Sequence, residues 1–316
     1  MENVSEIYRN LVLLGIVEIE PLQYLYAMIA IIIYVSTMML SSMIVYIIWS
    51  EETLHEPMYI FIGNLVVNVI FGNSAIVPKM VIDLLFGLNT ISLPGCLIQA
   101  FCYQSFGVLE LFAFTVMAYD RYLAVRDPLR YPTLMTNRRA FWILFAALVF
   151  VSLSIGITVA LAARLSMCGE YINNMFCETM SLLRLACGDT TINNVYGTIW
   201  TMTVLTSCLL VVIYCYIRTF LVCLNVSVEA YQKGIYTLIT HIVSFSSFEA
   251  ASLFVIFRYR LGSGSLSTLS HVFISITGVI VSITLNPLIY GIRTEALRIK
   301  LIANKMYLWR SIVITK

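Results

Sequence analysis

The sequence predicts an all-α membrane protein in which seven transmembrane helices form one bundle. Three observations lead to this fold class. Of the 316 residues, 60% are apolar and only 11% are charged, whereas a soluble domain carries about 25% charged residues. Seven apolar stretches are each long enough to cross a bilayer, which takes about 20 residues. Finally, Lys and Arg favour alternate connecting segments, as the positive-inside rule describes for a chain that crosses a membrane repeatedly.

The seven apolar stretches fill most of the chain between two short tails. Residues 1–21 contain four Glu and lack a basic region followed by an apolar run, so they are expected to be a tail rather than a signal peptide. The stretches are interpreted as helices because lipid offers no partner to an unpaired backbone group. Within a bundle at 22–292, the predicted spans are 22–49, 58–78, 93–119, 140–163, 190–217, 234–257 and 261–292.

An odd number of spans places the two termini on opposite sides of the membrane. With the N-terminus outside, the inner side holds 13 of the 19 Lys and Arg residues and the outer side holds the other six. The positive-inside bias therefore predicts an outer N-terminus and an inner C-terminus. In the tail 293–316, basic residues alternate with Leu and Ile, which suits a short amphipathic eighth helix on the inner membrane surface. A disordered basic tail is the alternative.

Four of the eight cysteines fall on the predicted outer side, namely Cys96, Cys168, Cys177 and Cys187. An even number of cysteines in an oxidising compartment indicates disulfides, but four cysteines allow three pairings and the sequence alone does not choose among them. The tail also contains Asn3-Val4-Ser5, a glycosylation sequon on the same side.

Several short motifs occur in a fixed order and identify a resemblance. Residues 117–122 read MAYDRY at the inner end of the third span and resemble the signature of vertebrate odorant receptors, a branch of the rhodopsin-like G-protein-coupled receptors. Further matches to that family are LHEPMY at 54–59, PKM at 78–80, SLLRLAC at 181–187, the stretch 233–241 and NPLIY at 286–290. Glu56 in the second motif is reminiscent of the fish members.

The resemblance implies both a covalent framework and a function. It implies disulfides Cys96–Cys177 and Cys168–Cys187. It also implies that a small odorant binds between the helices of a multi-pass plasma-membrane receptor, which then activates a stimulatory heterotrimeric G protein and raises cAMP.

A candidate activation switch lies at the predicted inner end of the bundle. In the switch hypothesis, Arg121 is held by Asp120, and the alternative is that this Arg is only a membrane anchor. Pro287 removes a helical hydrogen bond and permits a hinge beside Asn286. The expected members of the switch are Asp120, Arg121, Tyr122, Tyr214, His241, Asn286, Pro287 and Tyr290. For His241, a satisfied core residue and a proton-sensitive contact near Arg121 are both open.

Two acids lie in the apolar spans, where an ionisable side chain costs free energy, and each is therefore expected to have a function. Glu110 lies 11 residues before Arg121, or about 16 Å along a helix, where the resemblance implies a sodium or water pocket shared with Asn286. This chain departs from the family there, since Ser41 and Val69 occupy positions that are usually Asn and Asp. Sodium is thus a possible ligand with two of its usual polar neighbours missing, and no other cofactor is expected.

Glu249, in the outer half of the sixth span, suggests a cationic ligand such as an amine. The alternative is a neutral acid bonded to a neighbour such as His271. Apolar walls with a few polar groups suit a small ligand, and helical spacing places Tyr103, Gln104, Gly107, Val108, Phe245, Glu249 and Leu253 around the predicted cavity.

Other classes of function fit the sequence less well. The three His lie on different segments and form no catalytic set, so an enzyme is not expected. Internal repeats and paired broken helices, which are typical of transporters, are not evident, and the net charge of +2 does not indicate a nucleic-acid partner. A rhodopsin-like receptor for a different small ligand or a peptide, outside olfaction, is the main alternative.

Overall fold

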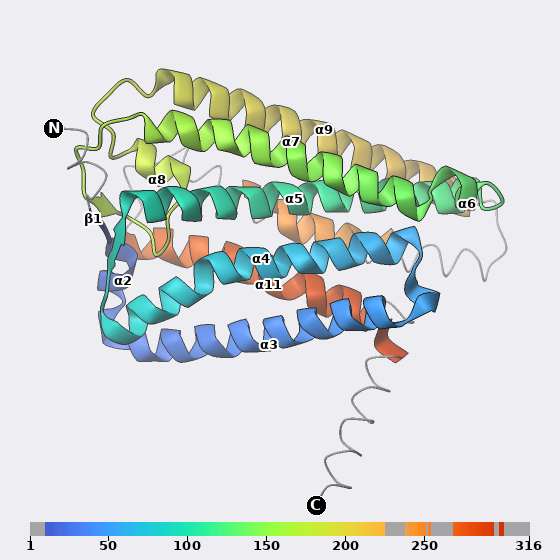
Figure 1. Cartoon of the computed structure of the whole chain (residues 1–316), viewed down its shortest axis with the longest axis horizontal. Coiled ribbons are helices and arrows are strands. Elements are labelled where there is room, and N and C mark those ends of the chain that lie inside the picture. The colour runs from blue at the N-terminus through green and yellow to red at the C-terminus, as the bar shows by residue number, and fades with distance from the viewer. Residues whose placement is uncertain are drawn as a thin grey trace, which may run out of the picture.

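In the computed structural model, the described residues are 10–224, 238–239, 241–250, 252–253, 268–293 and 297–299. Their long helices run side by side along the longest axis of the molecule (Figure 1). These helices are α3 (Gln23–Ser50), α4 (Pro57–Phe86), α5 (Leu93–Arg126), α7 (Asn137–Ala163), α9 (Thr191–Cys223) and α11 (Thr268–Arg293). A further helical segment, 241–250, belongs to the sixth apolar stretch and is called helix 241–250 below.

Short elements connect the long helices at both ends of the bundle. They are the helical turns α2 (Leu14–Glu18), η1 (Glu20–Leu22), η2 (Glu52–Leu54), α6 (Tyr131–Leu134) and α8 (Thr179–Leu183), and the strands β1 (Asn10–Leu13), β2 (Thr90–Ser92) and β3 (Tyr171–Ile172). Figure 1 shows β1, α2 and α8 at one end of the bundle and α6 at the other. We call these the disulfide end and the Arg121 end.

Several helices extend beyond the predicted spans. α4 continues through Pro78 to Phe86, although the span was predicted to end at that proline. A proline inside a helix removes one hydrogen bond, and in a membrane bundle neighbouring groups compensate for it, so the helix bends or continues rather than ending. α5 continues to Arg126 and α9 to Cys223, because a helix does not have to stop where its apolar sequence stops.

The outer faces of the bundle are apolar. Five of the described helices are long and apolar enough to cross a membrane. Large side chains such as Met39, Trp49 and Phe145 are more than half exposed on α3 and α7. The interior is formed around α5, which packs against α4, α7 and α9. Apolar side chains that point outward along whole helices are consistent with lipid as the surrounding solvent.

A small sheet that the sequence did not predict covers the disulfide end. Its strand order is β2-β1-β3, with β1 antiparallel to β2 and parallel to β3. Leu11 and Leu13 on β1 are fully buried. The segment before the first long helix is therefore packed on the bundle from residue 10 onward, instead of forming a free tail.

Candidate functional site

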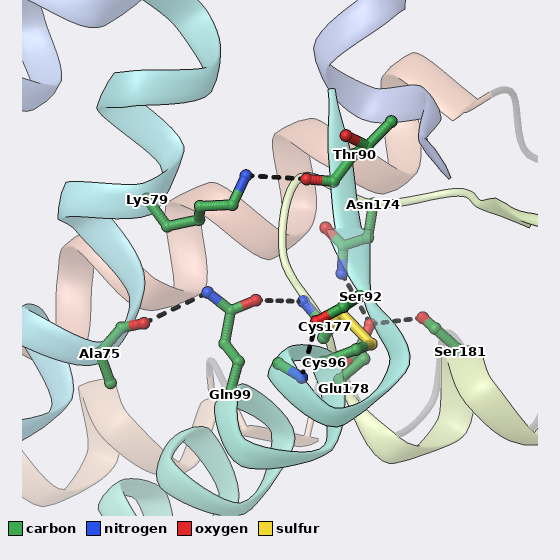
Figure 2. The surroundings of a disulfide bond; sticks show 11 residues. Ala75, Lys79, Thr90, Ser92, Cys96, Gln99, Asn174, Cys177, Glu178 and Ser181 are labelled. Carbon is green, nitrogen blue, oxygen red and sulfur yellow. Dashed lines mark hydrogen bonds between the residues drawn. A yellow bond between two sulfur atoms is a disulfide. The ribbon is translucent and has the colours of Figure 1, made fainter. Parts of the chain in front are cut away.

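The disulfide end is held together by covalent bonds and by a polar network around one of them. Cys96, in the first turn of α5, is bonded to Cys177, and Cys168 is bonded to Cys187. This is the pairing that the resemblance implied. Beside the first bond, the Gln99 side chain donates to the Ala75 carbonyl at 3.2 Å and accepts from the Cys177 N–H at 2.8 Å (Figure 2). Gln99 thus links α4, α5 and the long loop.

Two further groups of polar contacts tie this end to its loops, and Figure 2 shows the bonds of Lys79 to Thr90 and of Glu178 to Asn174 and Ser181. Lys79 pairs with Asp83 one turn along α4 and donates to the Thr90 carbonyl on β2 at 3.0 Å. In the long loop, the Oε1 atom of Glu178 accepts from Asn174 Nδ2 at 2.7 Å and from Ser181 Oγ at 3.3 Å. The buried carboxylate of Glu178 is therefore already engaged by protein donors.

A cavity of about 250 Å³ lies beneath this network, between α5, α7, α8 and α9. Four of the predicted ligand residues line it from α5, namely Tyr103, Gln104, Gly107 and Val108. Most of the remaining wall is apolar, as expected for a site that takes a small organic molecule.

The sixth span contributes other residues to this cavity than those predicted, because its helix is rotated differently about its axis. Phe248 and Ser252 line the cavity, whereas Phe245, Glu249 and Leu253 are not among the described residues that do so. Phe245 packs edge-on against Phe114 with ring centroids 6.0 Å apart, and Leu253 is 40% exposed. Helical spacing fixes which residues share a face, but it does not fix how the helix is rotated about its axis.

Glu249 is buried on a face of helix 241–250 that does not line the cavity. Its side chain is 8% exposed, and its Oε1 atom has no hydrogen-bond partner among the residues that the structure describes. His271, the neighbour proposed for it, belongs to the residues whose side chains are not described. The structure therefore removes the observation on which the cationic-ligand hypothesis depended.

The wall that α9 and the long loop provide was not predicted from the sequence. Asn193, Tyr196, Gly197, Trp200 and Val204 line the cavity from α9. Their spacing of three and four residues was a signal for one helical face, but aromatic residues in an apolar span are equally expected to face lipid. The loop contribution, Glu178, Thr179, Met180 and Leu183, had no sequence signal, because the disulfides and the turn α8 position it.

Glu110 and Asn286 meet deep in the bundle, as expected from the motifs. Asn286 Nδ2 lies 3.0 Å from both carboxylate oxygens of Glu110, which is fully buried. The amide therefore faces the acid as a hydrogen-bond donor, and an amide nitrogen is not a ligand that sodium prefers. Ser41 and Val69 are also fully buried. A sodium ion at this site stays a prediction.

At the Arg121 end, the structure corrects the predicted lock. Asp120 accepts a hydrogen bond from the Tyr131 hydroxyl of α6 at 2.8 Å, and it forms no ion pair with Arg121 among the described residues. Adjacent residues of a helix do not face each other, which accounts for the difference. The Nε atom of Arg121 is buried and lacks a partner within the described part of the chain.

Burial, reinforced by the nearby charge of Asp120, raises the pKa of the Tyr131 hydroxyl above its usual range. At physiological pH this hydroxyl stays protonated, and it can therefore donate to the carboxylate of Asp120. The hydrogen-bond partner of the motif acid is thus a neutral tyrosine of the connecting segment.

The other predicted switch residues form two separate pairs. His241 and Tyr290 are both buried, with the Tyr290 hydroxyl 3.2 Å from His241 Nδ1. Tyr214, expected near Arg121, is instead 54% exposed and packs edge-on against Tyr122, with ring centroids 5.9 Å apart. Tyr216, two residues further on, has a buried hydroxyl that finds no partner among the described residues. Pro287 lies inside α11 beside Asn286.

Comparison with a solved structure identifies the class of protein. Squid rhodopsin superimposes with a TM-score of 0.70, covering 92% of this chain and 86% of that chain at 15% sequence identity. Such a likeness shows the fold. The chain is a seven-helix protein of the rhodopsin type.

The family follows from sequence comparison. The profile of the olfactory receptor family matches residues 29–308. The chain is 33% identical to human olfactory receptor 5B21, over 97% of this chain and 99% of the relative. It is 31% identical to mouse olfactory receptor 5AP2, over 93% of this chain and 92% of the relative. This chain belongs to the olfactory receptor family.

Membership of this family makes the protein a G-protein-coupled receptor of the plasma membrane and not an enzyme. The resemblance to fish receptors stays a prediction, as do the placement of the termini and glycosylation at Asn3. Asn3 and most of the tail 293–316, with its predicted eighth helix, lie outside the described residues.

Proposed function

We propose that this receptor binds a small odorant in the cavity between α5, α7, α8 and α9 and then activates a stimulatory heterotrimeric G protein, which raises cAMP. The cavity is the observation that carries the proposal. Its volume of about 250 Å³ exceeds that of a 150 Å³ cavity known to hold benzene, so a compact odorant of roughly ten non-hydrogen atoms would fit.

Helix 241–250 offers a route from the cavity to the Arg121 end. Phe248 lines the cavity and packs against Phe114 with ring centroids 5.7 Å apart. His241, seven residues earlier and therefore about 10 Å along the same helix, is paired with Tyr290. A ligand that displaces Phe248 would shift this helix and weaken the contact between His241 and Tyr290. In this proposal, that contact stabilises the inactive state.

The first experiment measures cAMP in cells that display the receptor with a tag on its N-terminus, against a panel of neutral odorants, amines, acids and amino acids. We expect at least one compound to raise cAMP in the wild type. Arg121→Ala should abolish the response at equal surface display. Arg130→Ala is the matched control, because Arg130 is an exposed arginine at the same end. A response that survives in Arg121→Ala would contradict the proposed switch.

If the receptor is well displayed but none of the compounds in the panel raises cAMP, the stimulatory coupling would be contradicted. Repeating the panel with a calcium readout would then test coupling to a different G protein.

A further inference from the structure

The walls of the cavity contain buried polar atoms that lack partners, and their chemistry restricts the ligand. Trp200 Nε1 and Asn193 Nδ2 on α9, and Gln104 Oε1 on α5, have no hydrogen-bond partner among the described residues. All three residues line the cavity. A buried polar group without a partner is costly, and a bound molecule that supplies the missing partner removes that cost.

Both unpaired groups on α9 are donors. An indole N–H can only donate. Asn193 already uses its oxygen, which lies 3.5 Å from Arg164 Nη2, so its free atom is the amide nitrogen. A ligand satisfies these groups only with an acceptor atom. Asn193 and Trp200 are seven positions apart, which corresponds to about 10 Å along the helix, so one ligand atom cannot accept from both.

Trp200 and Gln104 lie at a similar depth in the bundle. α5 and α9 both begin at the disulfide end. Gln104 lies 11 positions after the start of α5, or about 16 Å, and Trp200 lies 9 positions after the start of α9, or about 13 Å. A donor on α9 thus lies at the same level as an acceptor on α5. Asn193 is nearer the disulfide end, and Thr179 Oγ1 on α8 also lacks a partner in the described part of the chain.

The charges around the cavity disfavour an anionic ligand, and the unpaired donors disfavour a cationic one. Among the described residues that line it there is no Lys, Arg or His, so a carboxylate would have no counter-charge. The acid in this wall is Glu178, whose Oε1 already accepts from Asn174 and Ser181, and it would repel an anion. An ammonium ion offers only donors and leaves Trp200 and Asn193 unpaired.

We propose that the ligand is a neutral molecule with a carbonyl oxygen, such as a ketone, aldehyde or ester, and that Trp200 donates a hydrogen bond to this oxygen. The nitrogen is covered in the structure, so the indole has to turn toward the ligand as it binds. A hydroxyl or amide N–H beside the carbonyl would strengthen binding, because it can donate to Gln104. This inference rests on the proposed function, since it assumes that the cavity is the odorant site.

The test measures binding to purified receptor in nanodiscs by ligand-induced thermal stabilisation, and so does not depend on any G protein. The probes share one skeleton: acetophenone and other phenyl ketones, aldehydes and esters, against ethylbenzene, 1-phenylethylamine and benzoate. We expect carbonyl compounds to bind more tightly than the other three. Trp200→Phe keeps an aromatic ring and should weaken carbonyl binding about tenfold, the effect of losing one hydrogen bond, while leaving ethylbenzene unchanged.

The comparison with ethylbenzene separates loss of the hydrogen bond from loss of shape. Asn193→Ala is the second variant, and it should weaken the binding of carbonyl compounds long enough to reach this residue, again without affecting the binding of ethylbenzene. Tighter binding of the amine or the acid, no binding of any carbonyl compound, or equal loss of ketone and ethylbenzene binding would each overturn the inference. Carbonyl binding without a cAMP response would instead support the inference and contradict the stimulatory coupling.

Discussion

The two ends of the bundle are stabilised by different kinds of interaction. At the disulfide end, two covalent bonds, a three-stranded sheet and the Gln99 bridge connect the helices to their loops. At the Arg121 end, the described contacts between elements include single hydrogen bonds, such as Tyr131 to Asp120 and Tyr290 to His241. One such bond contributes about 1 kcal/mol, which is enough to bias an equilibrium between two states but not to prevent it.

This contrast suggests a division of roles. A preformed ligand site needs walls that hold their positions, and cross-links in the surrounding loops provide this. A surface that changes shape on activation needs contacts that are individually weak. Variants that remove one contact at each end should therefore differ in kind: loss of folded receptor at the disulfide end, and altered signalling with normal display at the Arg121 end.

The largest effect is expected from the disulfide end. Replacing Cys96 and Cys177 together by Ser should lower stability by about 2–5 kcal/mol and strongly reduce surface display. The bond Cys168–Cys187 spans 19 residues against 81 for Cys96–Cys177, so its removal should cost about 1 kcal/mol less in the loop-entropy description. Thermal unfolding of the two double variants in nanodiscs measures the difference. Equal losses would show that native contacts around the bonds dominate over loop closure.

A smaller effect, and one on signalling, is expected from Tyr131→Phe. The substitution removes the hydroxyl that donates to Asp120 but keeps the ring. If this bond stabilises the inactive state, its loss should raise basal cAMP by up to about tenfold, the equivalent of 1.4 kcal/mol. Surface display should not change. Thr133→Val, which removes a local hydroxyl contact in the same exposed turn, is the control.

The outcome for Tyr131→Phe tests the comparison between the ends directly. Unchanged basal cAMP at normal display would mean that this bond only positions the connecting segment. A loss of display as large as that of the cysteine variants would mean that the Arg121 end is also a structural support, and the contrast between the two ends would fail.

How much of the fold could be predicted from the sequence depends on how far apart in the chain the interacting residues are. The seven spans were predictable because lipid requires long uninterrupted apolar helices. The sheet was not, because β1 pairs with segments about 80 and 160 residues away in the chain, and each strand is too short to show an alternating pattern. Pro78 looked like the end of a helix, but it lies inside one.

The candidate site shows the same limit. Tyr103, Gln104, Gly107 and Val108 were correctly placed because Arg121 fixes both the depth and the direction of their helix. Glu249 was misplaced because no comparable marker fixes the rotation of its helix. Trp200 was missed because an indole in an apolar span is as compatible with lipid as with a cavity, and only the cavity that it lines gives its N–H a role.

The smallest effect is expected from Arg126→Cys, which removes an exposed arginine at the Arg121 end. Arg126 Nη1 donates to the Tyr122 hydroxyl at 2.6 Å, and its guanidinium lies 3.3 Å from Asp127. Tyr122 in turn packs against the exposed ring of Tyr214 on α9. The arginine thus stabilises a contact between α5 and α9 at the Arg121 end. Because it is exposed to solvent, its contribution should be small.

We therefore expect Arg126→Cys to change basal and ligand-stimulated cAMP by no more than a few-fold, with unaltered display. Arg126→Lys should show most of the same change, because lysine keeps the charge but not the guanidinium geometry. Tyr214→Phe keeps the ring contact with Tyr122 but removes the hydroxyl that hydrogen-bonds it, so it should change basal cAMP by a part of the same amount. If Arg126→Cys instead matched or exceeded Tyr131→Phe, the main support of the inactive state would lie between α5 and α9, and the bond from α6 to Asp120 would be secondary.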